Sequence, residues 1–240
     1  MTFVLEIAQP GDAARITQIH MDAFSSNALI RAIHAVDGDL SALRKAVEKR
    51  ALDDMQDSKT TVIVVRDVES SAMRNIIGFA KWVAPIYPGE PHSTPSWNLA
   101  KTTNWEILGP WIAKEKKAEE EIISTTPHWG TYFALHTSYT DEYASEDLTY
   151  LAVDADYAKQ GVGTMMVKWA LDQCEADGCP TFVTSTVDSV SFYEKLGFKE
   201  SGRISIDLVD LNKGGNAGVY EEVVCAYTPR KRELLGVADT

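Results

Sequence analysis

Two glycines one residue apart, Gly161 and Gly163, stand between an apolar run and an amphipathic pattern. Glycine lets the backbone turn tightly and leaves it uncovered by a side chain. After the turn, apolar residues recur at helical spacing: Val162, Met165, Met166, Trp169 and Ala170. The first N–H groups of such a helix have no acceptor within the helix, so an anion can dock there. The spacing therefore predicts a turn that binds a phosphate group.

The stretch from Leu148 to Phe198 supplies the elements that would hold this turn in place. It predicts, in order, a strand that includes Leu151 and Val153, the glycine turn, a helix, a second strand, a short helix and an aromatic turn. Thr186 and Asp188 lie where the second strand leads into the short helix, so Thr186 is a candidate cap for that helix.

The flanking regions predict further strands and helices of one sheet. A strand over Phe3–Ala8 is followed by a helix capped by Asp12, and by two more helices over 27–35 and from Leu40 onward. Further strands are expected over 60–65, 75–84, 202–209 and 220–227, the last two joined by a glycine-rich turn over 212–216.

The segment from about Pro85 to Glu146 is long for a connection between two strands. It opens with a proline-rich loop to Pro95 and contains AKEKKAEEEI, over 113–122, which predicts a solvent-facing helix. Aromatic residues surround that helix: Trp97, Trp105, Trp111, Trp129, Tyr132, Phe133 and Tyr139. They fit the lining of an amine pocket and an ordinary core equally well, and the segment fits a lid, a substrate pocket or an interface.

Composition excludes several classes of protein. The 240 residues carry a net charge of −12, which opposes nucleic-acid binding and suits a cationic amine, although it also suits mere solubility. No apolar run is long enough for a membrane helix, and the N-terminus lacks a secretory pattern. The three cysteines match no zinc pattern. We expect a cytoplasmic protein without a metal and without a membrane partner.

Taken together, the order of elements and the two motifs resemble the GNAT superfamily of acyl-CoA-dependent N-acyltransferases. The resemblance covers most of the chain and is strongest from Leu148 to Phe198. Gly161 and Gly163 fill the glycine places of the family's signature, whereas Ala158 stands where Gln or Arg is usual. The long insert looks most like that of fungal small-molecule N-acetyltransferases.

The resemblance implies an α/β (α+β) fold, with a mixed, mostly antiparallel central sheet flanked by helices and with splayed central strands. It implies one domain over residues 1–230, with an insert at about 85–146 and a C-terminal tail over 231–240. The expected co-substrate is acetyl-CoA, with no metal. Its binding residues would be Leu151, Ala152 and Val153 for the pantetheine arm, Lys159, Gln160, Gly161, Val162, Gly163 and Thr164 for the pyrophosphate, and Thr186.

Tyr193 of the aromatic turn occupies the place of the family's proton donor to the departing thiolate. Its alternative is a packed aromatic beside Phe192 and Phe198, which already supply apolar bulk. The implied activity is transfer of acetyl from acetyl-CoA to a primary amine of a small molecule, by direct attack in a ternary complex. A catalytically inactive CoA sensor and a protein or peptide N-acetyltransferase stay open, as do a monomer and a homodimer. The general base stays open among a water chain and Glu146, Asp147, His136, Glu106 and His92.

Overall fold

The computed structural model describes residues 2–35, 38–70, 75–87, 90, 99–123, 126–130, 151–208 and 218–230. Within these ranges eight strands form one sheet in the order β1-β2-β3-β4-β6-β8-β7, and β5 pairs with β3 off this path. The strands are β1 Phe3–Ile7, β2 Thr60–Asp67, β3 Asn75–Val83, β4 Trp129–Gly130, β5 Leu151–Val153, β6 Thr181–Thr186, β7 Lys199–Asp207 and β8 Val219–Tyr227. Every pairing is antiparallel except that of β4 with β6. The prediction of a mixed, mostly antiparallel sheet is confirmed.

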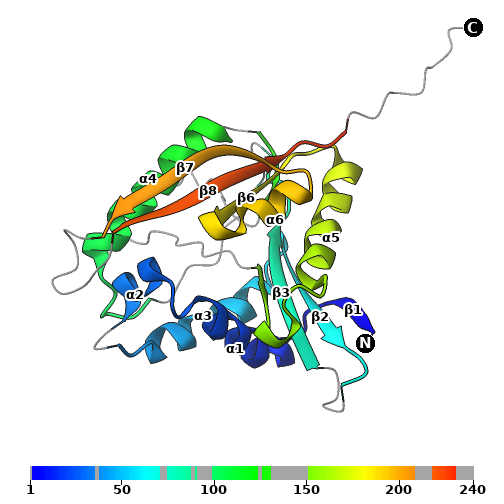
Figure 1. The fold of residues 1–240 in the computed structure, drawn as a ribbon, viewed down its shortest axis with the longest axis horizontal. Coiled ribbons are helices and arrows are strands. Elements are labelled where there is room, and N and C mark those ends of the chain that lie inside the picture. Colours follow the sequence, from blue (N-terminus) through cyan, green and yellow to red (C-terminus); the bar gives the residue numbers. More distant parts are fainter. Residues whose placement is uncertain are drawn as a thin grey trace, which may run out of the picture.

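Helices cover both faces of the sheet (Figure 1). They are α1 Ala13–Phe24, α2 Ala28–His34, α3 Ser41–Asp54, α4 Trp105–Ile122, α5 Val162–Asp177 and α6 Val190–Lys195, with 3-10 turns η1 Pro10–Asp12, η2 Ala155–Tyr157 and η3 Val187–Ser189. None of the helices in the described ranges is long and apolar enough to cross a membrane.

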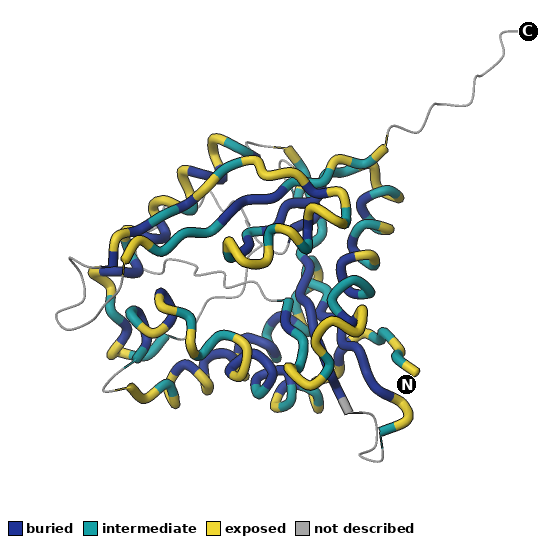
Figure 2. Tube along the Cα trace, in the orientation of Figure 1, coloured by how far each residue is buried: buried dark blue, intermediate teal, exposed yellow. Residues whose placement is uncertain are grey.

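One face of the sheet has a single continuous core, whereas the other face has two separate cores. Under α5 and α6, one buried cluster runs from Ile63 on β2 and Ile77 on β3 to Val183 on β6 and Val223 on β8. On the other face, α1 and α3 form a cluster with β2 and β3, while α2 and α4 form a different one with β6, β7 and β8. Buried residues accordingly line the strands beneath each helix (Figure 2). One core under α5 therefore joins the β1–β3 half of the sheet to the β6–β8 half. On the opposite face each half has its own helices and its own core.

The sheet divides beside β5. Along one edge of β3, Val83 pairs with Gly130 of β4 and Ala80 pairs with Leu151 of β5. β4 continues the sheet to β6 through a parallel pair, whereas β5 pairs with β3 and with no other described strand. This is the predicted separation of the central strands.

The prediction that the Asp12 side chain caps α1 is wrong. Asp12 precedes α1, but its side chain makes no capping bond to that helix. Its carboxylate accepts the Gln9 N–H at 2.8 Å and pairs with Arg66 Nη2 at 2.7 Å. Because Asp12 is the last residue of η1 and has helical dihedral angles, it does not adopt the extended conformation of a usual cap.

Helix α4 is longer and more buried than predicted. The charged pattern indicated a solvent-facing helix over 113–122, but α4 begins at Trp105 and packs on β7. Trp111 and Trp129 are buried in the core, whereas Trp105 is 50% exposed. For Trp111 and Trp129, the core alternative is therefore the one observed.

Replacing Gly78 of β3 by alanine is expected to destabilise the fold. A Cβ there would lie 2.8 Å from Val162 Cγ1 and 3.2 Å from Met166 Cε, both on α5. Such overpacking typically costs about 1–3 kcal/mol. Denaturant unfolding of Gly78→Ala measures this loss. Gly109→Ala, in α4 with no atom within 4 Å of its new Cβ, is the control and should not be destabilised. Equal stabilities of the two variants would contradict this packing.

Candidate functional site

The segment between β5 and α5 is held by side chains from distant parts of the chain. Asp154 Oδ1 accepts the Asp156 N–H at 3.0 Å, and Asp154 Oδ2 pairs with Arg15 of α1. The hydroxyl of Tyr157 donates to Asp67 Oδ2 at 3.1 Å. Sequence reasoning missed these anchors, because nothing local marks residues that pair across the fold. They set where the glycine turn begins.

The glycine turn has an unusual backbone. Lys159 has a φ of 60° and is the one described non-glycine residue in the left-handed region; Gly161 follows with a φ of 88°. A left-handed residue costs a non-glycine roughly 1–2 kcal/mol. Left-handed residues next to right-handed ones bring successive N–H groups into a concave array that suits an anion.

The N–H groups of this turn have no acceptor in the described part of the chain. The first helical bond runs from Met165 N to Gly161 O at 2.9 Å, so the N–H groups of Val162, Gly163 and Thr164 precede it. Gly161 stands at the cap position and has no side chain to accept them. None of the residues from Lys159 to Thr164 donates a backbone hydrogen bond within the described ranges. The predicted pyrophosphate residues thus form one run of free donors.

The side chains of the turn differ in their availability. The Gln160 amide donates to the Asp156 carbonyl at 3.0 Å, so it serves the loop itself. Lys159 is exposed, and its ammonium makes no ion pair within the described ranges. Lys159 is therefore the cation at the turn that is free to meet an anion.

The backbone of β5 points alternately toward β3 and away from it. Asp154 N–H donates to the Ile77 carbonyl at 2.8 Å, in register with the pair Ala152 and Phe79. Because antiparallel hydrogen bonds alternate along a strand, Ala152 directs its N–H and C=O at β3. Leu151 and Val153 direct theirs to the open edge. This geometry narrows the predicted pantetheine contacts to Leu151 and Val153.

Helix α6 brings Phe192, the residue before Tyr193, close to the glycine turn. A Cβ placed on Gly163 would lie 3.3 Å from the Phe192 ring and 3.8 Å from Leu151 Cδ2. Tyr193 is 7% exposed, and its ring centroid lies 5.0 Å from that of Phe192 and 5.5 Å from that of Phe198. Burial, with a smaller contribution from Cys225, raises the pKa of its hydroxyl. Tyr193 is thus both a packed aromatic and a phenol that stays protonated, and its neighbour Phe192 lies against the glycine turn.

Thr186 occupies the cap position of the turn that leads to α6, but its side chain makes no capping bond to the backbone. It precedes η3, and its hydroxyl donates to Ser189 Oγ at 3.2 Å. Thr186 is therefore a cap in position alone, and its contact with a ligand stays a prediction.

Most residues considered for the general base lie outside the described ranges. Among them only Glu106 is described, and it is exposed in the first turn of α4. The other candidates for the base lie outside the described ranges: His92, His136, Glu146 and Asp147. The same holds for four aromatic candidates of the amine pocket: Trp97, Tyr132, Phe133 and Tyr139.

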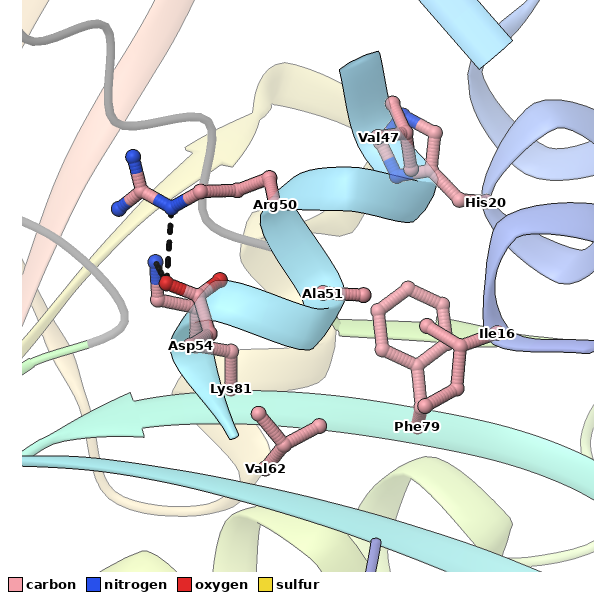
Figure 3. A pocket seen from close by; sticks show the side chains of 9 residues that line it. All are labelled: Ile16, His20, Val47, Arg50, Ala51, Asp54, Val62, Phe79 and Lys81. Carbon is pink, nitrogen blue, oxygen red and sulfur yellow. Dashed lines mark hydrogen bonds and ion pairs between the residues drawn. The ribbon is translucent and has the colours of Figure 1, made fainter. Parts of the chain in front are cut away.

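Two hollows in the described structure bear on where a ligand could bind. The first, of about 20 Å³, lies under α3, where Asp54 Oδ1 meets Arg50 Nε at 2.7 Å and Lys81 Nζ at 3.0 Å (Figure 3). It has room for about one water molecule and so is no substrate pocket. The second, an open groove of about 730 Å³, lies between the C-terminal half of α5 and the end of β8. No group of three or more potential metal ligands occurs among the described residues.

Comparison with known proteins relates the same part of the chain to acyl transfer. A family profile described as an acetyltransferase (GNAT) domain matches residues 110–200. The peptidyl-lysine N-acetyltransferase YjaB of Salmonella typhimurium is 41% identical over 69 residues, 28% of this chain and 45% of that protein. The matched region thus spans less than half of that relative's length.

Two solved structures share the fold. A structure described as histone acetyltransferase HPA2 and related acetyltransferase from Corynebacterium glutamicum has a TM-score of 0.58 at 17% identity, over 98% of this chain and 100% of that one. An N-acetyltransferase from Staphylococcus aureus has a TM-score of 0.53 at 12% identity, over 95% of this chain and 99% of that one. At these identities only the fold is shared. The likeness to fungal enzymes stays a prediction.

Substituting Gly161 by alanine is expected to weaken CoA binding about tenfold. No atom lies within 4 Å of the new Cβ, so the change acts through the left-handed backbone, which costs alanine roughly 1–2 kcal/mol. Titration calorimetry with CoA measures the effect. Gly11→Ala, also without a neighbour within 4 Å, is the control. Unchanged affinity in Gly161→Ala would show that CoA does not depend on this turn.

Proposed function

We propose that this chain, whose residues 110–200 match a family profile described as an acetyltransferase (GNAT) domain, transfers an acetyl group from acetyl-CoA to a primary amine. The family uses acetyl-CoA. The observation that supports the proposal most strongly is the run of free N–H groups from Lys159 to Thr164, next to the open edge of β5. A pyrophosphate would accept from the first and an extended pantetheine arm would pair with the second.

The residues of this site fit acetyl-CoA in charge and in hydrogen bonding. Backbone donors at a helix start suit two linked phosphates, and Lys159 adds a positive charge. Leu151 and Val153 offer N–H and C=O groups toward the open edge, which suits the amides of pantetheine. One of these N–H groups would also polarise the thioester carbonyl.

The thioester supplies an acetyl group that is already activated, so the protein needs to orient groups and move protons. The amine nitrogen forms the new C–N bond as the C–S bond breaks. An ammonium acceptor loses two protons in all: one is balanced by the proton that the sulfur receives, and the other passes to solvent. Tyr193 would donate to the sulfur, because its raised pKa keeps the hydroxyl protonated at neutral pH.

The acceptor we favour is the primary amine of a small molecule. A second candidate, a lysine side chain of a protein, is supported by the printed name of the Salmonella relative. A thiol-release assay with acetyl-CoA separates them when run on phenethylamine, spermidine, glycinamide, glucosamine and a lysine-containing peptide. Turnover of a small amine supports a small-molecule acceptor, whereas turnover of the peptide alone supports a protein lysine as the acceptor. Tight CoA binding without any turnover would indicate a CoA sensor instead.

Replacing Tyr193 by phenylalanine is expected to lower turnover roughly 10²–10⁴-fold near neutral pH, the usual contribution of a general acid. The packing against Phe192 and Phe198 needs only the ring, so stability and CoA affinity should stay close to wild type. Steady-state kinetics and calorimetry on the same preparation measure both. Wild-type turnover in this variant would remove Tyr193 from the reaction.

A further inference from the structure

A carboxylate on β8 lies opposite Thr186, one of the predicted cofactor-binding residues, and faces the interior. Glu222 pairs in register with Thr186 of β6 and with Ile204 of β7. Directly opposed residues in an antiparallel pair place their side chains on the same face. Glu222 is therefore on the face covered by α2 and α4, beside the end of β6 from which the chain leads to Tyr193.

Glu222 belongs to a short chain of hydrogen bonds. Asn27, the cap of α2, donates from Nδ2 to the Tyr220 hydroxyl at 2.9 Å. That hydroxyl donates to Glu222 Oε1 at 2.5 Å. This chain of bonds ends at Glu222 Oε1, and no described residue donates to Glu222 Oε2. One carboxylate oxygen is fixed and the other remains an open acceptor.

No cation of the described chain neutralises this carboxylate. Burial raises the pKa of Glu222, the Tyr220 hydrogen bond lowers it by less, and no charged side chain contributes. The residue still keeps part of its surface accessible. Glu221, the preceding residue, is oriented oppositely and pairs with Arg203 Nη1 at 2.5 Å. A half-buried carboxylate without a countercharge is costly in its ionised form unless a ligand supplies the positive charge, and otherwise it tends to take up a proton.

The neighbours of Glu222 suit an organic ammonium ion. The Trp111 ring lies 5.5 Å from the Tyr220 ring in an edge-on arrangement. From α4, Glu115 is close enough to raise the pKa of Tyr220, after burial and Glu222. The residues opposite Glu222 on β6 and β7, Thr186 and Ile204, are not titratable. The surroundings thus combine packed aromatic rings with negative charge.

We infer that Glu222 is the acceptor-binding residue and general base of the proposed acetyl transfer: its Oε2 binds the ammonium group of the acceptor and takes one proton from it. The neutral amine is then free to attack, and Glu222 later releases that proton to solvent. Tyr220 and Asn27 act as positioning residues that orient the carboxylate. This inference rests on the proposed function.

The test compares Glu222→Gln with Glu221→Gln in the amine assay and in calorimetry. For the panel amine with the highest turnover, Glu222→Gln is expected to lower kcat/KM about 100-fold or more. It should also weaken binding of that amine to the CoA-saturated protein about tenfold. CoA affinity should be unchanged in both variants, and Glu221→Gln should match wild type throughout.

The pH profile of kcat/KM distinguishes a general base from a residue with a merely structural role, because loss of a structural residue would leave the profile unchanged. Glu222 must be ionised to take a proton, so kcat/KM of wild type should rise with pH through the raised pKa of this carboxyl. Glu222→Gln should lack that rising limb. Tyr220→Phe should keep the limb but shift it, because the hydrogen bond from its hydroxyl favours the ionised form.

Stability supplies an independent readout. Because burial raises the folded-state pKa of Glu222, its ionisation opposes folding above that pKa, and the opposition disappears as pH falls toward the ordinary value of the group. Glu222→Gln should therefore raise Tm at about pH 8, with a difference that shrinks toward about pH 5. A lower Tm together with lower turnover would indicate a structural role and overturn the inference.

The outcomes separate this inference from the proposed function. Wild-type kinetics and pH profile in Glu222→Gln would overturn the role of Glu222 and leave the acetyltransferase intact. A wild-type protein that binds CoA but neither binds nor acetylates any amine of the panel would overturn the proposed function, and this inference with it.

Discussion

Among the described residues, β5 hydrogen-bonds to a neighbouring strand along only one edge, and the geometry of the site depends on that constraint. Backbone groups that have no partner in the fold need one from elsewhere. Leu151 and Val153 direct such groups to the open edge, and the chain then passes through the anchored segment at Asp154 into the turn with free N–H groups. The continuous core under α5 holds both halves of the sheet while they separate on the opposite face. The described part of the fold thus places next to each other two sets of donors that it does not satisfy itself, which suits one extended anionic ligand.

Three backbone positions make this arrangement possible. Gly78 lets α5 approach β3 to a distance that a Cβ would prevent, so the helix start lies against the sheet. Gly161 and Lys159 take left-handed conformations, and Lys159 does so without the freedom of glycine. Strain of this kind persists where the surrounding structure over-determines it, which is frequent at ligand sites. Here the Asp154 anchor and the Gln160 bond to Asp156 hold the segment that leads into the turn.

Sequence was informative where the determinants are local and weak where they are distant. The glycine turn, the helix after it and the position of Tyr193 follow from short patterns, and the structure has all three elements. Asp12 was wrong as a side-chain cap because Arg66, remote in sequence, competes for its carboxylate. Arg15 and Asp154 pair across 139 residues, which no local pattern indicates. For Glu222 a signal existed: two adjacent glutamates in an apolar strand must face opposite sides, so one of them must face inward.

The central claim is that the open edge of β5 and the start of α5 together bind CoA. Amide hydrogen exchange followed residue by residue by NMR, with and without saturating CoA, tests it most directly. The expected result is protection of the N–H groups from Lys159 to Thr164 and of Leu151 and Val153, with little change at Ala152, which already faces β3. Protection confined to the groove between the C-terminal half of α5 and the end of β8, around Lys168 and Arg230, would contradict it.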